Sequence, residues 1–431
     1  MRIDPTTLGD LEVFGTTGGK GGLFELLDQT ATSIGRTALR RRISLPSSRI
    51  GEIRRTQEAV RFLLNHPGLV RLDGALVDAV SQYLRSNIET REVHPLMEKV
   101  ERTWMSMRYP AILEELEDGM RATGTLFASV KRITVDLLAY DPPEVIREIA
   151  VRISESAEAV VRDGSGLNPG MRLDRTLREE LRSGIEGALV LLGELDALNA
   201  MAQVTRSLGW AMPDLVEEEA FVLEADGIYH PFLQNAVTNP ISLSGGEPLL
   251  FLTGPNMAGK TTYLKSVALV VMLAQVGMGV PAARARLTPV EVLFTSLNPA
   301  DNLRAGLSYF LAEVLRVKEA AEILAEGRRA LVLFDEVFKG TNVRDALDAS
   351  AEVIRGFARA RRSGFIFSSH LTELVEVLKP MERIRFCCFD GEIVEGSPHY
   401  GFKLRDGVSE KRFGLLLLRQ AQVPQLLARI A

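Results

Sequence analysis

Cysteine is scarce in this chain. Its 431 residues include only two cysteines, which are adjacent at Cys387 and Cys388. Two neighbouring thiols cannot supply a disulfide framework or the usual four-ligand zinc site, and such low cysteine usage is typical of a reducing compartment. The N-terminal sequence, MRIDPTTLGD, also lacks the apolar core of a signal peptide. We therefore expect a cytoplasmic protein.

Long apolar runs and an excess of basic residues are missing as well. The longest apolar run, Val267 to Met278, contains Gln275 and Gly277 and is too short to cross a bilayer. We predict that it forms a buried helix, and we expect no membrane association. The net charge of −5 gives no overall signature of polyanion binding, so a nucleic-acid site would have to be a local patch.

The chain does contain a complete phosphate-binding pattern after a short apolar strand predicted at Leu249 to Leu252. The loop and first helical residues are Gly254, Pro255, Asn256, Met257, Ala258, Gly259, Lys260 and Thr261. Glycine lets the backbone approach phosphate oxygens, and the N-terminus of the following helix favours an anion. Lys260 is predicted to reach the β- and γ-phosphates of ATP, and the Thr261 hydroxyl to bind Mg²⁺. The order of strand, loop and helix argues against a chance glycine turn.

Two later strands are predicted to end in chemically useful side chains. Ala330 to Phe334 is followed by Asp335, which is predicted to hold Mg²⁺ through water, and by Glu336, which would orient or deprotonate the attacking water. A chance apolar strand before Asp-Glu is the alternative. Phe365 to Ser368 delivers His370 to its carboxyl end, where open α/β sheets bind ligands. We interpret His370 as a γ-phosphate sensor rather than a lone structural histidine.

The predicted elements divide the chain into three parts. Residues 1–22 are predicted to be irregular, residues 23–215 to form an all-α core and lever domain, and residues 216–431 to form an α/β P-loop NTPase domain with a mostly parallel sheet. A periodic stretch from Asp174 to Leu208 would make one helix of about 50 Å, which suits a lever, although a plain bundle helix is the alternative.

Two other motifs have simpler interpretations. The segment Leu243 to Glu247, LSGGE, is similar to the signature of ABC-type ATPases, but it precedes the phosphate loop, and a glycine turn is favoured. The run Arg40 to Arg42 could contact a phosphate backbone, but a solvated helix end is the favoured interpretation.

Several segments resemble the ATPase domain of the MutS family of DNA mismatch-repair proteins. They are GPNMAGKTTYLKSVAL, VPAARARLTPVEVLFTSLNPADNLRAGLSYFLAEV, LVLFDEVFKGTN and SSHLTEL. LFELLDQTATSIGRTALRRRISLP and LLGELDALNAMAQ resemble the helical core and lever of the family, and DGVSEKRFGLLLLRQAQVP resembles the closing helix of its ATPase domain. The resemblance covers residues 20 to 431 and is strongest from residue 225 onward.

This resemblance implies roles for matching positions. Residues Gly254 to Thr262 would bind the triphosphate, with Asn256 near the γ-phosphate. Ser308 matches the signature that family members insert into the nucleotide site of the partner subunit, which implies a homodimer through the ATPase domains. One adenine-stacking aromatic of the family falls on Ala236, and Phe402 is predicted to stack on the other face of the base. The family also implies binding to nucleic acid, namely double-stranded or branched DNA.

The sequence departs from the family as well. We expect the N-terminal mismatch reader with its Phe-x-Glu wedge to be missing, and the DNA-gripping clamp to be missing or reduced. The predicted function is a Mg-dependent ATPase that couples hydrolysis at composite dimer sites to DNA binding in mismatch repair or a related process. One alternative is a relative that acts on recombination junctions or on ribosomal or RNA complexes. Another is a non-hydrolysing dimerisation scaffold, against which Glu336 and His370 argue.

Overall fold

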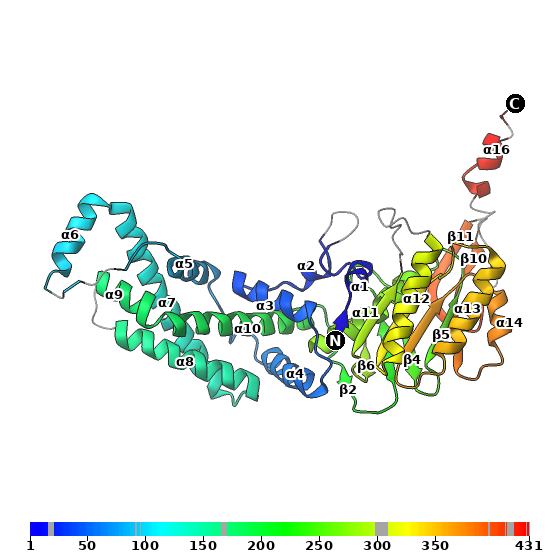
Figure 1. Cartoon of the computed structure of the whole chain (residues 1–431), viewed down its shortest axis with the longest axis horizontal. Coiled ribbons are helices and arrows are strands. Elements are labelled where there is room, and N and C mark those ends of the chain that lie inside the picture. The colour runs from blue at the N-terminus through cyan, green and yellow to red at the C-terminus, as the bar shows by residue number, and fades with distance from the viewer. Residues whose placement is uncertain are drawn as a thin grey trace. The chain divides into compact units, whose positions relative to one another are not determined.

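Figure 1 shows the computed structural model of the chain. It describes residues 1–15, 21–90, 93–94, 96–164, 170–297, 309–394, 397–409, 411, 418–427 and 429–430. The chain forms two compact units. The helical unit contains Leu26–Ser44 and Arg54–Leu208, and the α/β unit contains Met1–Glu25, Leu45–Ile53 and Gly209–Ala431. This division differs from the predicted parts 1–22, 23–215 and 216–431, because two segments from the first half of the chain belong to the α/β unit.

The helical unit packs long helices side by side. The helices between residues 23 and 207 are α2 (Leu23–Leu27), α3 (Ser33–Ser44), α4 (Ile50–Asn65), α5 (Gly74–Leu84), α6 (Glu98–Arg108), α7 (Pro110–Ala139), α8 (Glu144–Gly164), α9 (Met171–Arg175) and α10 (Arg182–Ser207). α7 packs on α5 and α8, and α10 packs on α3 and α8. On α8 the stripe from Ile146 to Val160, spaced by three and four residues, is buried as helical periodicity requires.

The long helix predicted from Asp174 to Leu208 is not continuous. A π-helical turn, η1 (Thr176–Glu180), separates α9 from α10. A buried ion pair lies at this turn: the Arg178 Nε donates to Asp174 Oδ1 at 2.7 Å, and Tyr83 on α5 donates its hydroxyl to the same oxygen at 2.7 Å. Arg178 also donates to the Ile88 carbonyl at 2.6 Å. Because buried charges must be paired and hydrogen-bonded, these contacts fix where the helix is interrupted.

The α/β unit is organised by a seven-stranded sheet. Its strand order is β1 (Arg2–Ile3), β7 (Val292–Ser296), β8 (Ala330–Asp335), β9 (Gly364–Ser368), β5 (Leu249–Thr253), β10 (Ile384–Val394) and β11 (Ser397–Asp406). All neighbours are parallel except β10 and β11. β5, β8 and β9 are buried at every position, as expected for strands covered on both faces.

Helices cover both faces of this sheet. They are α11 (Lys260–Val276), α12 (Tyr309–Ala325), α13 (Val343–Phe357) and α14 (Glu373–Leu378). α12, α13 and α14 share one apolar core with alternate residues of the strands, such as Phe251, Phe334 and Phe367. α11 leads from β5 toward β7, against the direction taken by the other crossovers, and right-handed connections therefore place it on the opposite face. The α-then-α/β fold class with a mostly parallel sheet is confirmed.

A smaller sheet flanks the large one. Its order is β2 (Asp214–Leu215), β6 (Arg284–Leu287), β3 (Val222–Ile228) and β4 (Asn239–Ser244). The alternating residues from Arg383 to Phe389, followed by Asp390-Gly391, predict a hairpin that turns at this pair, and the structure differs from that prediction. Asp390 and Gly391 do not turn the chain. They lie within β10, at a register shift between Phe389 and Gly391, and β10 continues to Val394.

The N-terminal residues are part of the α/β unit rather than an irregular lead. β1 pairs with β7, and α1 (Pro5–Asp10) is capped by Asp4. The Asp10 carboxylate accepts from Thr295 Oγ1 at 2.7 Å and from the Leu297 amide at 3.0 Å. Arg316 on α12 donates to Asp4 at 3.0 Å. These polar contacts join residues that are far apart in the sequence, so the pattern of residues within the N-terminal segment could not indicate them.

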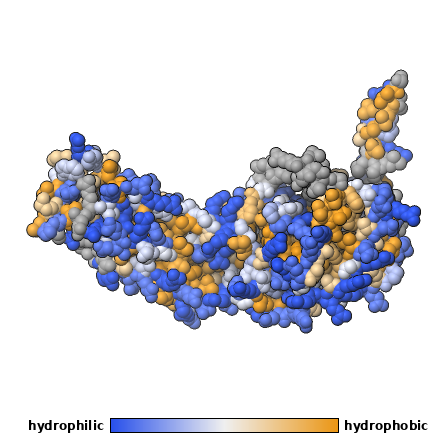
Figure 2. All heavy atoms as spheres, in the orientation of Figure 1, coloured by the Kyte–Doolittle hydropathy of each residue, from blue (hydrophilic) through white to orange (hydrophobic). Residues whose placement is uncertain are grey.

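Large apolar side chains are exposed at several places along the described part of the chain, including the following two. In the helical unit, Met97, Val100, Trp104 and Met107 on and beside α6 are exposed, and orange patches lie among blue ones at this end of the unit in Figure 2. The short helix α16 (Val423–Leu427) also exposes Leu426 and Leu427. None of the helices in the described part of the chain combines the length and apolar character needed to span a membrane.

Candidate functional site

The phosphate-binding pattern forms a tight loop between β5 and α11. Its backbone has positive φ at Gly254 (140°), Met257 (69°) and Gly259 (101°), and Gly259 is the N-cap residue of α11. At Gly254 a Cβ would lie 2.3 Å from the Phe389 carbonyl oxygen. This close approach and the positive φ together require glycine. Pro255 and Ala258 are buried in the same loop, whereas Asn256 and Met257 are exposed.

Lys260 lies under the loop with its ammonium group held by the protein. Its side chain is 5% exposed, and Nζ donates to the Gly254 carbonyl at 2.8 Å and to the Pro255 carbonyl at 3.2 Å. Nζ is also 3.7 Å from Glu336 Oε1. Burial lowers the pKa of Lys260, and the carboxylates of Glu336 and Asp335 oppose that effect. A buried cation next to helix N-terminal amides is suited to a polyanion.

Thr261, in the first turn of α11, meets Asp335 at the carboxyl end of β8. Thr261 Oγ1 donates to Asp335 Oδ2. The other carboxylate oxygen, Asp335 Oδ1, is buried and has no hydrogen-bond partner among the residues that the structure describes. A buried polar atom without a partner is uncommon. The hydroxyl and this carboxylate fit Mg²⁺, which binds oxygen ligands and keeps water and phosphate oxygens in its shell.

A purely protein-built metal site is not part of this arrangement. Within the described ranges, no cluster of three or more His, Cys, Asp or Glu side chains could hold a metal ion. A site of one carboxylate and one hydroxyl agrees with the usual binding of Mg²⁺ together with phosphates.

Two lysine ammonium groups and the His370 imidazole surround Glu336. Its Oε2 lies 2.6 Å from Lys339 Nζ and 3.7 Å from His370 Nδ1, and its amide donates to the Ser368 carbonyl at 2.9 Å. The His370 imidazole, together with the ammonium groups of Lys339 and Lys260, lowers the pKa of Glu336 from 4.5 to about 2, against the effect of burial. Glu336 is therefore ionised at neutral pH. The sequence interpretation missed Lys339, although it lies only three residues after Glu336.

These residues meet because of the strand order. β8 and β9 are neighbours, with Asp335 and Ser368 in register, and β9 is next to β5. β5 leads to a helix on one face of the sheet, whereas β8 and β9 lead to helices on the other face. A crevice at the carboxyl ends of the strands, at such a switch point, is where α/β sheets bind ligands.

Most of the predicted site residues line one cavity of about 610 Å³. Its walls include Asn256, Met257, Gly259, Lys260, Thr261, Thr262, Asp335, Glu336, Lys339 and Phe402. Gly254, Pro255 and Ala258 form the loop behind this wall, and His370 reaches the site through Glu336. Ala236 lies in the same cavity. Ser308 lies outside the described residues.

Phe402 is held at the cavity by a residue that the sequence interpretation did not identify. Asn239 on β4 is 6% exposed; its Nδ2 donates to the Phe402 carbonyl at 2.9 Å, and its Oδ1 accepts from the Leu404 amide at 2.8 Å. Phe402 has a φ of 51° and faces the phosphate loop, since a Cβ on Gly259 would lie 3.3 Å from its ring. The contact joins residues 163 apart in sequence, so no local motif could reveal it.

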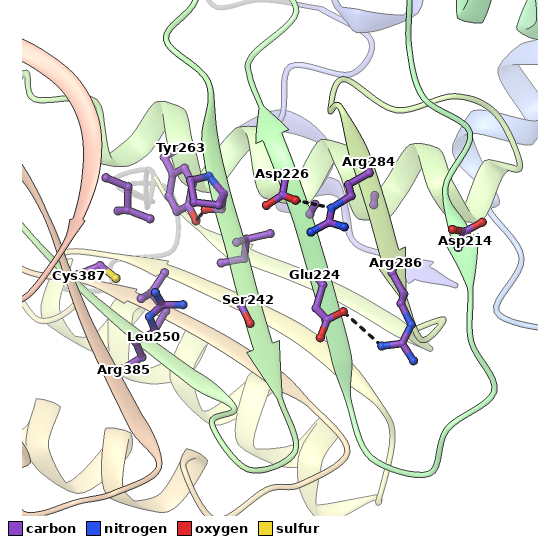
Figure 3. Close-up of a pocket in the computed structure, with 15 residues that line it drawn as sticks. Asp214, Glu224, Asp226, Ser242, Leu250, Tyr263, Arg284, Arg286, Arg385 and Cys387 are labelled. Carbon is purple, nitrogen blue, oxygen red and sulfur yellow. Dashed lines mark hydrogen bonds and ion pairs between the residues drawn. The ribbon is translucent and has the colours of Figure 1, made fainter.

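A second cavity of about 460 Å³ lies between the two sheets (Figure 3). Figure 3 shows Arg284 directed toward Asp226 and Arg286 toward Glu224, and both pairs are ion pairs. Arg385, which also lines this cavity, pairs with an aspartate at 2.7 Å. Its arginines already have carboxylate partners, and it is therefore less suited to a triphosphate than the cavity at the phosphate loop.

The simpler interpretations of two motifs agree with the structure. Arg41 and Arg42 both pair with Glu194 on α10. In the LSGGE segment, the Ser244 amide donates to the Glu247 carbonyl and the Glu247 amide to Ser244 Oγ, both at 3.1 Å, which is a tight turn.

Comparison with known protein families decides the family. The model of MutS domain III matches residues 6–208, and the model of MutS domain V matches residues 250–431. The chain belongs to the MutS family. Domain V is the ATPase domain of that family, so the cavity at the phosphate loop belongs to an ATP-binding domain.

One MutS-family relative is similar over nearly the whole chain. It is the DNA mismatch repair protein MutS of Bacillus pumilus (strain SAFR-032), which is 24% identical over an alignment of 526 residues. The alignment covers 98% of this chain and 61% of the relative. The chain thus spans about three fifths of the length of the curated relative that it matches.

The contacts of Asn239 lead to a prediction about nucleotide affinity. Asn239→Ala is expected to release Phe402 and weaken ATP binding by about tenfold, since each hydrogen bond contributes about 1 kcal/mol and about 1.4 kcal/mol is a factor of ten. Titration with a fluorescent ATP analogue would measure the change. Thr238→Ala, at the exposed neighbouring position, is the control. Unchanged affinity in Asn239→Ala would mean that Phe402 does not depend on this contact or does not stack on the base.

Proposed function

We propose that this MutS-family chain hydrolyses Mg-ATP at composite sites in a homodimer and couples the cycle to DNA binding. The observation that carries the proposal is the convergence of Lys260, the Thr261–Asp335 pair and ionised Glu336 in one cavity. These are the groups that phosphoryl transfer to water needs: a cation for the phosphates, oxygen ligands for a metal, and a carboxylate for the water.

Phosphate binding would use the Lys260 ammonium, whose hydrogen bonds go to carbonyl groups of the loop. Lys260 would exchange its contacts with the Gly254 and Pro255 carbonyls for β- and γ-phosphate oxygens. The amides of the loop and of the first turn of α11 would hold the same phosphates. Thr261 and Asp335 would hold Mg²⁺, which supplies charge neutralisation when bound.

The water would be oriented by Glu336. Its pKa of about 2 makes it a weak base, so among the two roles predicted from sequence we favour orientation over full deprotonation. His370, 3.7 Å from the Glu336 carboxylate, would then sense the γ-phosphate from the end of β9. Phe402 would stack on the adenine ring.

The DNA and dimer parts of the proposal depend on the family. The relative from Bacillus pumilus is a DNA mismatch repair protein by name, and the domain III match supports a nucleic-acid role for the helical residues. We propose that the helical unit, within the predicted core and lever domain 23–215, grips double-stranded or branched DNA, and that the α/β unit, which contains the predicted ATPase domain 216–431, hydrolyses ATP, with Ser308 completing the partner's site. Cytoplasmic location is also part of the proposal, because both cysteines are free and buried.

The hydrolysis proposal can be tested with two variants. Glu336→Gln is expected to bind Mg-ATP but to hydrolyse it at least about 100-fold more slowly than the wild type, because the carboxylate that orients water is gone. Lys260→Ala is expected to lose both binding and turnover. Phosphate release and analogue binding would be measured for each. Full turnover in Glu336→Gln would disprove its role, and no turnover in the wild-type dimer would favour the non-hydrolysing scaffold.

The composite site predicts complementation between inactive variants. Ser308→Arg should bind nucleotide but not associate or turn over with ATP, because the arginine would replace the serine that faces the partner's phosphate. Mixed with Lys260→Ala, it should regain partial hydrolysis, since one hybrid site has an intact loop and an intact Ser308. The matched control mixes Ser308→Arg with the double variant Lys260→Ala/Ser308→Arg, in which no complete site can form. Normal hydrolysis by Ser308→Arg as a monomer in sedimentation experiments would refute the composite site.

The DNA proposal predicts binding without mismatch preference. The family models that match this chain are those of domains III and V, whereas the Phe-x-Glu wedge of the family belongs to an N-terminal domain, so we expect the residues of this chain to bind matched and mismatched duplexes equally. Affinities for matched, mismatched, branched and RNA ligands would be measured over a range of salt concentrations. A mismatch preference of about tenfold, or about 1.4 kcal/mol, would reveal a reader in the helical unit. Preference for junctions or RNA would support the alternative functions.

A further inference from the structure

The turn that carries Glu336 has an unusual backbone. It lies between β8 and α13, and Glu336 and Phe338 have φ values of 50° and 68°. Residues other than glycine avoid this left-handed region, and a strained conformation persists only where the surrounding structure holds it. The position of the Glu336 carboxylate therefore depends on whatever fixes the turn.

α12 holds the turn through two side chains. Phe310 packs against Phe338 with their ring centroids 5.8 Å apart, and Phe338 is 4% exposed. Glu313, one helical turn further along α12, accepts hydrogen bonds from the Lys339 and Gly340 amides, each at 3.3 Å. The Glu313 side chain is thus directed at the backbone of the turn and not at the nucleotide cavity, whose lining does not include it.

Glu313 is buried, with only 2% of its surface exposed. Burial raises its pKa, and the amides of the turn, together with the charge of Lys339, oppose that rise. A buried carboxylate is costly unless it is well hydrogen-bonded. An acceptor with two oxygens matches two successive N–H donors, whereas glutamine would turn an NH₂ group toward one of them.

We propose that Glu313 is a positioning residue for ATP hydrolysis, which fixes the Glu336–Gly340 turn and so holds Glu336 in place. The proposal rests on the function proposed above for Glu336. The same turn carries Lys339, whose ammonium contacts the Glu336 carboxylate at 2.6 Å. Glu313 therefore holds the backbone of a residue that in turn contacts Glu336.

The first test separates turnover from binding. Glu313→Gln keeps the volume of the side chain, but its NH₂ group cannot accept a hydrogen bond from one of the two amides of the turn. It should lower kcat by about tenfold or more, equivalent to about 1.4 kcal/mol, while the KM for ATP and the affinity for an ATP analogue stay within about twofold. The control is Glu322→Gln, an exposed glutamate on the same helix that pairs with Lys318. It should match the wild type.

The second test asks whether Glu313 acts through Glu336. If it does, the double variant Glu313→Gln/Glu336→Gln should be no slower than Glu336→Gln alone, because the group being positioned is already gone. Thermal unfolding of each variant would check folding. Should Glu313→Gln unfold, Glu313→Asp keeps the charge with a shorter reach, and it should lose kcat selectively.

The outcomes distinguish the two proposals. Full turnover in Glu336→Gln would overturn the function proposed for Glu336 and the role of Glu313 with it. Slow turnover in Glu336→Gln with normal kcat in the Glu313 variants would overturn the positioning role alone. The positioning role would also be overturned if the losses multiplied in the double variant, or if KM rose and the affinity for the analogue fell together with kcat.

Discussion

Charge balance at the carboxyl end of the parallel sheet is the constraint on which the site depends. Lys260 is nearly buried, and its ammonium lies near carboxylates supplied by β8 and the turn after it. If either the ammonium or the carboxylates lacked a partner of opposite charge, the protein would lose about 3–5 kcal/mol of stability. The loop carbonyls and Glu336 meet this need. A site balanced in this way can accept a polyanion by exchanging contacts rather than by building new structure.

The sequence could predict those parts of the site that depend on neighbouring residues. The phosphate loop is a local pattern, because its glycines and the start of α11 are fixed by a few adjacent residues. Asp335, Glu336 and His370 could be expected at strand ends because apolar strands precede them. That Asp335 and Glu336 share one cavity, with His370 beside Glu336, depends on the strand order, which the βα pattern restricts but does not specify. Whether they perform the proposed chemistry stays a prediction.

Other features could not be predicted because distant residues create them. The helix expected from Asp174 to Leu208 is interrupted where Arg178 and Asp174 meet Tyr83, which lies 91 residues away from Asp174. The turn expected at Asp390 is absorbed into β10 as a bulge, because pairing with β11 continues beyond it. Asn239 and Glu313 carry no motif, since their partners lie 163 and 26 residues away, respectively. Periodicity describes one element at a time, and these contacts join two.

Backbone strain gathers at this cavity, and that explains why residues outside the motifs matter to it. In the described part of the chain, eight residues other than glycine have positive φ, and four of them, Asn235, Met257, Glu336 and Phe402, line the cavity. Each such residue costs of the order of 1–3 kcal/mol and needs support from its surroundings. Phe402 is supported by Asn239, and the turn of Glu336 by Glu313 and Phe310. The loop and the acidic pair supply the reacting groups, but their geometry depends on these supporting contacts from β4 and α12. Substitution of a supporting residue should therefore impair the site while leaving every motif residue in the sequence intact.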